Sequence, residues 1–179
     1  MKVADGLRTY LPELLAWSAS SPFVENVNTG LHSARTEIFT RFFPRCGIPD
    51  AYGDWDTFAD YVGMLYGTGT ISDPTEMWWS VRPHLGFPTV EIRISDAQPI
   101  QEEAISLAAL SYSLAARIAR AVDEREPLLV PPNREIEENF WRAIRWGLSG
   151  EMIDLRTRKV RPTRAAIEEL IDGVQPVAA

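Results

Sequence analysis

The sequence predicts an α+β fold. Apolar residues recur at helical spacing through most of the chain, whereas two short segments near its middle alternate between apolar and polar residues as strands do. A turn over residues 83–88 separates these two segments, which predicts that they form an antiparallel pair. The regular strand–helix alternation of a doubly wound parallel sheet is missing, and so are both common glycine-rich phosphate loops.

Five helices are expected from the spacing of apolar residues and from capping residues. Their expected ranges are 5–18, 55–65 after the cap Asp54, 99–123, 133–146 with Asn133 as the cap, and 163–171. In the longest of them, an apolar face of small residues runs through Ile105, Ala109 and Tyr112. Residues 23–49 are expected to form an ordered loop that carries function, and residues 174–179 to fray.

The strands are predicted at residues 76–82 and 89–95. With 179 residues the chain fits a single domain that buries its own core. Its net charge of −7 argues against general binding to nucleic acid or to an anionic membrane.

A cytoplasmic location is the natural interpretation of a single cysteine, Cys46, and of a start without an apolar leader. Cys46 has no arranged histidine and aspartate beside it, which favours a packed thiol over a nucleophile. The two histidines, His32 and His84, lack the spacing of metal ligands.

The second predicted strand carries the most informative pattern. Val90, Ile92 and Ile94 should point into the core, which places Glu91 and Arg93 side by side on the opposite face. A carboxylate is a hard ligand for Mg²⁺, and a guanidinium can fork onto phosphate oxygens. The alternative is an ordinary half-exposed strand with a solvated ion pair, and the strand alone favours that alternative.

The first predicted strand adds a third charged residue. Arg82 shares a face with Trp78 and Ser80, so in a hairpin it should reach the side on which Glu91 and Arg93 lie. Paired tryptophans are most often core residues, and we expect that role for Trp78 and Trp79 before a role in stacking on a ligand.

These residues resemble a known family. Segments 78–84, Trp-Trp-Ser-Val-Arg-Pro-His, and 89–96, Thr-Val-Glu-Ile-Arg-Ile-Ser-Asp, look like the signature of the type 2 glutamate–cysteine ligases, which include weak carboxylate–amine ligases. Further matches follow in order through nearly the whole chain, at segments 11–23, 28–35, 44–49 and 138–147. Two departures are a serine, Ser80, where the family usually has an acidic residue, and an unusual turn at residues 84–88.

The resemblance implies half of a glutamine synthetase-like catalytic domain, in which part of a curved antiparallel sheet carries helices on one face. It implies Glu91 as a Mg²⁺ ligand, Arg93 as a contact of phosphate or acyl-phosphate, and Arg82 and Arg35 as contacts of nucleotide phosphate or substrate carboxylate. Arg93 and Arg82 would be the catalytic residues, and Arg35, Arg93 and Arg82 the ATP-binding ones. Three residues keep a family pattern without an assigned role, namely Asn139, Arg142 and Arg145.

The implied activity is an ATP- and Mg²⁺-dependent ligase of glutathione biosynthesis. It would join glutamate or a related carboxylate to an amine such as cysteine through an acyl-phosphate. The family's N-terminal part, with a Gly-x-Glu-Glu-Glu strand and histidine-bearing strands, has no counterpart in these residues. We therefore expect the isolated chain to be inactive, and to act with a separate N-terminal half or in a homo-oligomer. The alternative is a truncated, non-catalytic paralogue that serves as an interaction subunit.

Overall fold

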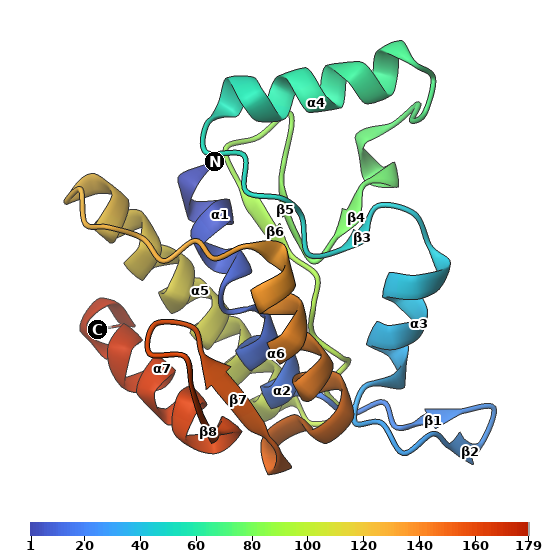
Figure 1. The fold of residues 1–179 in the computed structure, drawn as a ribbon, viewed down its shortest axis with the longest axis vertical. Helices are drawn as coiled ribbons and strands as arrows, with labels where there is room; N and C mark the ends of the chain where they lie inside the picture. Colours follow the sequence, from blue (N-terminus) through green and yellow to red (C-terminus); the bar gives the residue numbers. More distant parts are fainter. Residues whose placement is uncertain (179) are drawn as a thin grey trace.

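The computed structural model of the protein describes residues 1–178, and it shows a helix-rich α+β fold. Five helices pack around the main core and occupy the left and centre of Figure 1. Their bounds are α1 Lys2–Arg8, α2 Leu11–Ser18, α5 Gln101–Asp123, α6 Asn133–Trp146 and α7 Thr163–Ala178. The predicted α+β class is therefore confirmed.

The main core forms where α1 and α2 contact the other three helices. Leu7, Leu11, Leu14 and Leu15 are fully buried there. Burying a leucine side chain contributes roughly 1.5–3 kcal/mol, so this leucine-rich N-terminal segment supplies much of the stability. The core reaches the strands through Val81.

The described residues contain four two-stranded sheets. The pairs are β1 Phe23–Val24 with β2 Val27–Asn28, β3 Cys46–Gly47 with β4 Trp78–Trp79, β5 Val81–Pro83 with β6 Val90–Ile92, and β7 Glu151–Asp154 with β8 Lys159–Pro162. Only the pair of β3 and β4 is parallel. The predicted antiparallel pair is thus confirmed as β5 and β6, although both strands are shorter than expected.

Two further helices, α3 (Ala34–Phe42) and α4 (Trp55–Gly67), lie outside the main helix group in Figure 1. As predicted, Asp54 caps α4, because its side chain accepts a hydrogen bond of 2.8 Å from the Thr57 amide. A second, smaller core beneath α4 includes Phe58 and Trp79. Short 3₁₀ turns occur at Pro74–Glu76 and Gly147–Ser149.

Several expected boundaries were wrong. The first helix is two helices, because Pro12 lacks an N–H and is tolerated only in a first turn, so a new helix begins at Leu11. The first strand is interrupted because Trp78–Trp79 pairs with β3 before the chain enters β5 at Val81. The last helix continues to Ala178, so residues 174–178 are helical, and residue 179 lies outside the described residues.

The face of α5 that packs also differs from the prediction. Its buried stripe contains Leu107, Leu110, Leu114 and Ile118. The predicted face is solvent-exposed, with Tyr112 76% accessible. α5 has a mean hydropathy of 1.3 and is long and apolar enough to cross a membrane by length and composition alone, a test that core helices of soluble proteins also pass.

Candidate functional site

A compact cluster of charges lies on the β5–β6 pair. The strand register places Arg82 directly opposite Glu91. Arg82 Nη2 lies 2.6 Å from Glu91 Oε2, and Arg93 Nε lies 3.5 Å from Glu91 Oε1. The predicted meeting of these three side chains is confirmed. Both oxygens of the carboxylate therefore face a guanidinium.

The alternation of the strand explains why the three charges share one side. Ile94 is buried in the main core, and Val90 and Ile92 pack against that core from partly buried positions. Glu91 is exposed, as the opposite face requires. The apolar side chains thus fix the orientation of the strand, and the orientation presents the charges.

The two arginines of the cluster differ in how firmly their guanidinium groups are held. Arg82 is only 13% exposed in its side chain, and its Nη1 donates to the carbonyls of Met77, at 2.7 Å, and Pro74, at 3.2 Å. The Arg93 side chain is 29% exposed, and its one ion pair among the described residues is the longer contact with Glu91. Arg82 is therefore held as a fixed neighbour of Glu91, whereas Arg93 has terminal nitrogens available to a ligand.

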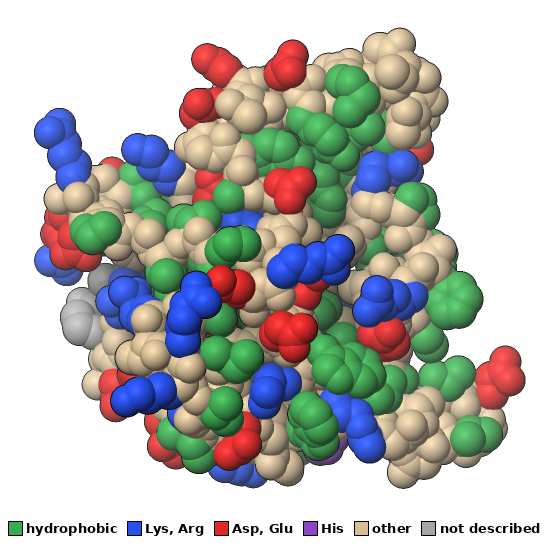
Figure 2. Space-filling model, in the orientation of Figure 1, with side chains coloured by type: hydrophobic (Ala, Val, Ile, Leu, Met, Phe, Trp, Pro, Cys, Tyr) green, Lys and Arg blue, Asp and Glu red, His purple; other side chains and the backbone are tan. Residues whose placement is uncertain are grey.

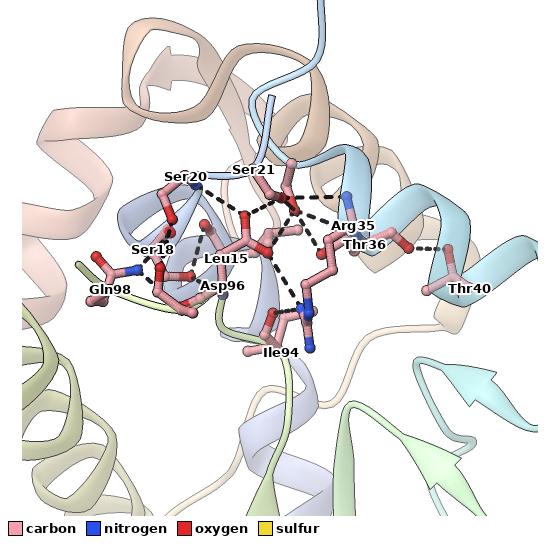
Figure 3. A network of polar contacts seen from close by, with 12 residues as sticks. Leu15, Ser18, Ser20, Ser21, Arg35, Thr36, Thr40, Ile94, Asp96 and Gln98 are labelled. Carbon is pink, nitrogen blue, oxygen red and sulfur yellow. Dashed lines mark hydrogen bonds and ion pairs between the residues drawn. The ribbon is translucent and has the colours of Figure 1, made fainter. Parts of the chain in front are cut away.

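Arg35 does not join this cluster. It begins in α3 and its Nη1 lies 3.3 Å from Asp96 Oδ1 and 3.4 Å from the Ile94 carbonyl (Figure 3). Its guanidinium also lies 5.8 Å from the centre of the Phe39 ring. Arg35 is therefore placed beside the chain segment that follows β6, and it stays 42% exposed.

Asp96 is the residue of this region that the sequence reasoning left without a role. Its carboxylate, 1% exposed, accepts hydrogen bonds from the Ser20 amide at 3.0 Å and the Ser21 hydroxyl at 2.7 Å, and lies 3.1 Å from Ser33 Oγ (Figure 3). The end of α2, the start of α3 and the segment after β6 are thus tied to one buried charge. The sequence offered no local signal for this role, because the three serines lie 63 to 76 residues away along the chain.

The described residues offer little for a metal ion on their own. No group of three or more histidine, cysteine, aspartate or glutamate side chains comes together among residues 1–178. Glu91 is the single carboxylate of the charge cluster, and Mg²⁺ needs near-octahedral oxygen ligands, several of which can be water or phosphate. Glu91 can therefore supply one ligand of such a site.

The two tryptophans divide between two environments. Trp79 is buried in the small core beneath α4, as predicted. Trp78 is half-buried, with its ring centre 5.4 Å from that of Phe43 and 5.8 Å from that of Phe39. Nearby in β3, burial raises the pKa of the Cys46 thiol despite the opposing charges of Arg93 and Arg45, which disfavours a role as a nucleophile.

The three α6 residues that keep the family pattern make structural contacts. Asn139 is buried, and its amide both donates to the Ile153 carbonyl and accepts from the Ile153 amide, at 2.7 Å each, which fixes β7 on α6. Arg145 donates to the Gly30 carbonyl, and Arg142 lies 3.5 Å from the Glu151 carbonyl. None of them contacts the charge cluster in these bonds.

Figure 2 shows acidic and basic side chains interspersed over one face of the molecule, with hydrophobic side chains gathered below α4. This face therefore presents no continuous basic surface of the kind that nucleic-acid binding uses.

Comparisons with known proteins agree with the motifs. The family model described as glutamate-cysteine ligase family 2 (GCS2) matches residues 1–179. A protein of Solibacter usitatus named "Putative glutamate--cysteine ligase 2" is 40% identical over 177 residues, which are 99% of this chain and 46% of that protein. One of the same name from Gloeobacter violaceus is 40% identical over 179 residues, 100% of this chain and 48% of that protein.

A third protein of that name, from Chloroflexus aurantiacus, is 39% identical over 170 residues, 95% of this chain and 43% of that protein. The chain spans about half the length of the curated relatives that it matches. Because the family model covers every residue, the chain belongs to glutamate-cysteine ligase family 2.

Proposed function

We propose that this chain is the C-terminal half of an ATP-dependent carboxylate–amine ligase, and that it forms an amide only together with the remaining half. The relatives' names support a glutamate–cysteine ligase, and their length supports a second half of similar size. That half is either a separate chain or another part of a longer polypeptide. Its expected contribution is the acidic strand and the histidines of the family's N-terminal part.

The observation that carries the proposal is the charge cluster on an open strand edge. The Arg93 amide donates to the Ser80 carbonyl at 2.8 Å, and the His84 amide to the Thr89 carbonyl at 2.9 Å. Because bonded and non-bonded pairs alternate in an antiparallel ladder, the backbone groups of Val90 and Ile92 point away from β5. The described residues give these groups no backbone partner, so the edge can accept a further strand.

In the completed enzyme, Glu91 would supply one ligand of Mg²⁺, and the positive charge of the ion would offset the negative charge of the phosphate oxygens. Arg93 would bind the transferring phosphoryl group or the acyl-phosphate with its free terminal nitrogens. Arg82 would keep Glu91 in place and contribute positive charge. Arg35, held by Asp96, would bind a nucleotide phosphate or a substrate carboxylate with its exposed edge.

A non-catalytic interaction subunit is the second candidate. Two observations favour it. Both oxygens of Glu91 are already matched by arginines of the same chain. Ser80, at the position where the family usually has an acidic residue, is buried, and among residues 1–178 its hydrogen bonds are the two that its backbone makes to Gly47 and Arg93.

Reconstitution separates the two candidates. The purified chain is mixed with the half of the Gloeobacter violaceus relative that it does not cover, and ADP release is measured with Mg²⁺, ATP, glutamate and cysteine. Turnover that requires both halves supports the ligase, and a stable but inactive complex supports the interaction subunit. Turnover by the chain alone would refute the need for a second half.

Hydrogen exchange tests the open edge without relying on activity. In the isolated chain the amides of Val90 and Ile92 should exchange rapidly, whereas the Arg93 amide, which is bonded to Ser80, should be slower. Adding the second half should slow exchange at Val90 and Ile92 and leave Arg93 little changed. Unchanged exchange at both edge amides in a formed complex would contradict pairing at this edge.

A further inference from the structure

A polar cavity of about 330 Å³ lies between α2, α7 and the β7–β8 hairpin, and it shares no residue with the charge cluster on β5 and β6. Its polar or charged lining consists of Thr9, Tyr10, Glu13, Arg117, Asp154, Arg156, Arg161 and Glu169. Its apolar lining consists of Leu129, Ile153, Leu155, Ala166 and Leu170. The cavity therefore combines a charged end with an aliphatic wall.

Two buried polar atoms in this lining lack partners among the described residues. They are Glu13 Oε2, an acceptor, and Arg161 Nε, a donor. The Arg161 guanidinium is anchored separately, because its Nη1 bonds to Glu169. A buried polar atom without a partner costs roughly 1–3 kcal/mol. Each of these two atoms has less than 1 Å² of accessible surface, so a ligand would recover that free energy only after the Glu13 and Arg161 side chains turn toward the cavity.

The lining holds equal numbers of basic and acidic side chains. Three arginines and three carboxyl groups line the cavity, and one pair of them, Arg161 and Glu169, is bonded directly. A ligand with a large net charge, such as a nucleotide, gains little from such a set, and a purely apolar ligand leaves both buried atoms unsatisfied. A small molecule with one positive and one negative end satisfies an acceptor and a donor together.

We propose that this cavity binds a zwitterion of the α-amino-acid class with an aliphatic side chain. Its ammonium group would donate to Glu13, and its carboxylate would accept from Arg161. Its side chain would lie against Leu129, Leu155 and Leu170. The inference does not depend on the ligase activity, and it assigns the chain a separate binding function.

The protonation of Glu13 gives the proposal a second readout. Burial raises the pKa of Glu13 to about 7, with Arg161 lowering it and Asp154 raising it. The other charged or titratable groups around the cavity are Tyr10, Arg117, Arg156 and Glu169. Since an ammonium group favours the ionised carboxylate, affinity should rise about tenfold between about pH 6 and about pH 8.

The direct test is calorimetric titration of the purified chain with L-leucine and two analogues. 4-Methylvalerate lacks the ammonium group, and isoamylamine lacks the carboxylate. We expect saturable binding of leucine, and each analogue to bind at least about tenfold more weakly. Absence of saturable leucine binding, or equal binding of either analogue, would overturn the proposal.

Variants locate the site. Glu13→Gln should weaken leucine binding about tenfold and abolish its pH dependence, and Arg161→Lys should weaken it while keeping the positive charge. Glu168→Gln and Arg164→Lys are the matched controls, because both residues are exposed on α7 and lie outside the lining. Methyl shifts at Leu155 on leucine binding would support the cavity. Shifts confined to Val90 and Ile92 would overturn the proposal and point to the β5–β6 site instead.

Discussion

Replacing Asp96 by alanine should lower the free energy of unfolding by about 3 kcal/mol. Its buried carboxylate accepts from the Ser20 amide and the Ser21 hydroxyl, and each such bond to a charged group contributes roughly 1.5 kcal/mol. The pair with Arg35 adds less than about 1 kcal/mol, because that guanidinium is 42% exposed and water can replace the carboxylate. Ser33 loses little, since its hydroxyl also reaches Thr36.

The assay for Asp96→Ala is urea denaturation followed by circular dichroism, with thermal melting beside it. A loss of about 3 kcal/mol corresponds to a fall in Tm of roughly 6–12 °C for a chain of this size. Asp60→Asn, on the exposed side of α4, is the control and should stay within about 0.5 kcal/mol of the parent. If Asp96→Ala melted like Asp60→Asn, the claim that this carboxylate ties three segments together would be wrong.

Three other changes have defined outcomes. In the reconstituted ligase, Glu91→Gln should lower turnover on the order of 100-fold, and Arg93→Lys should also lower it. Both variants should change the free energy of unfolding by roughly 1 kcal/mol or less, and Glu103→Gln is the control. Near-normal turnover of Glu91→Gln would refute its role as a metal ligand. Because the pKa of Glu13 is raised to about 7, its contribution to the free energy of unfolding should fall as pH rises from about 4.5 and level off above about 7, by at most about 3.4 kcal/mol. Denaturation curves of Glu13→Gln should lack this fall. Leu14→Ala should cost roughly 2–5 kcal/mol by urea denaturation, since Leu14 is fully buried, and a cost below about 1 kcal/mol would contradict its core position.

The charge cluster was predictable because it depends on a local rule. Alternation along β6 fixes the side on which Glu91 and Arg93 lie, and a short turn between β5 and β6 brings Arg82 opposite Glu91. None of these steps requires knowledge of distant parts of the chain. The finer assignments of metal and phosphate contacts rest on the family resemblance and stay predictions.

Contacts between distant segments were not predictable in the same way. Trp78 pairs with Cys46 in the parallel β3–β4 pair, and that pairing interrupts the strand that periodicity alone predicts as continuous through Arg82. Asp96 finds its partners 75 and 76 residues away, at Ser21 and Ser20. Such pairings are set by packing of the whole chain, and a single sequence contains no local signal for them.

The longest helix, α5, shows a second reason why the sequence did not predict all of the packing. α5 has two apolar stripes, and composition alone does not decide which one faces the core. The larger side chains of Leu107, Leu110 and Leu114 are the buried ones, because they fill the space between α1 and α7 better than alanines do. The exposed stripe with Tyr112 was mistaken for the core face.

The separation between core and charge cluster bears on how a half ligase could work. The main core is built by helices from both ends of the chain, and the β5–β6 pair packs against it through Val81, Val90 and Ile92. Arg82 is fixed by the carbonyls of Met77 and Pro74, and Glu91 is fixed by Arg82, so the cluster is positioned by this chain alone. In the proposed ligase, a second half would supply further ligands and pair with the open edge at Val90 and Ile92. Because the side chains of the cluster are already held in place within this chain, they would lose little conformational entropy on association, which favours reconstitution from purified parts.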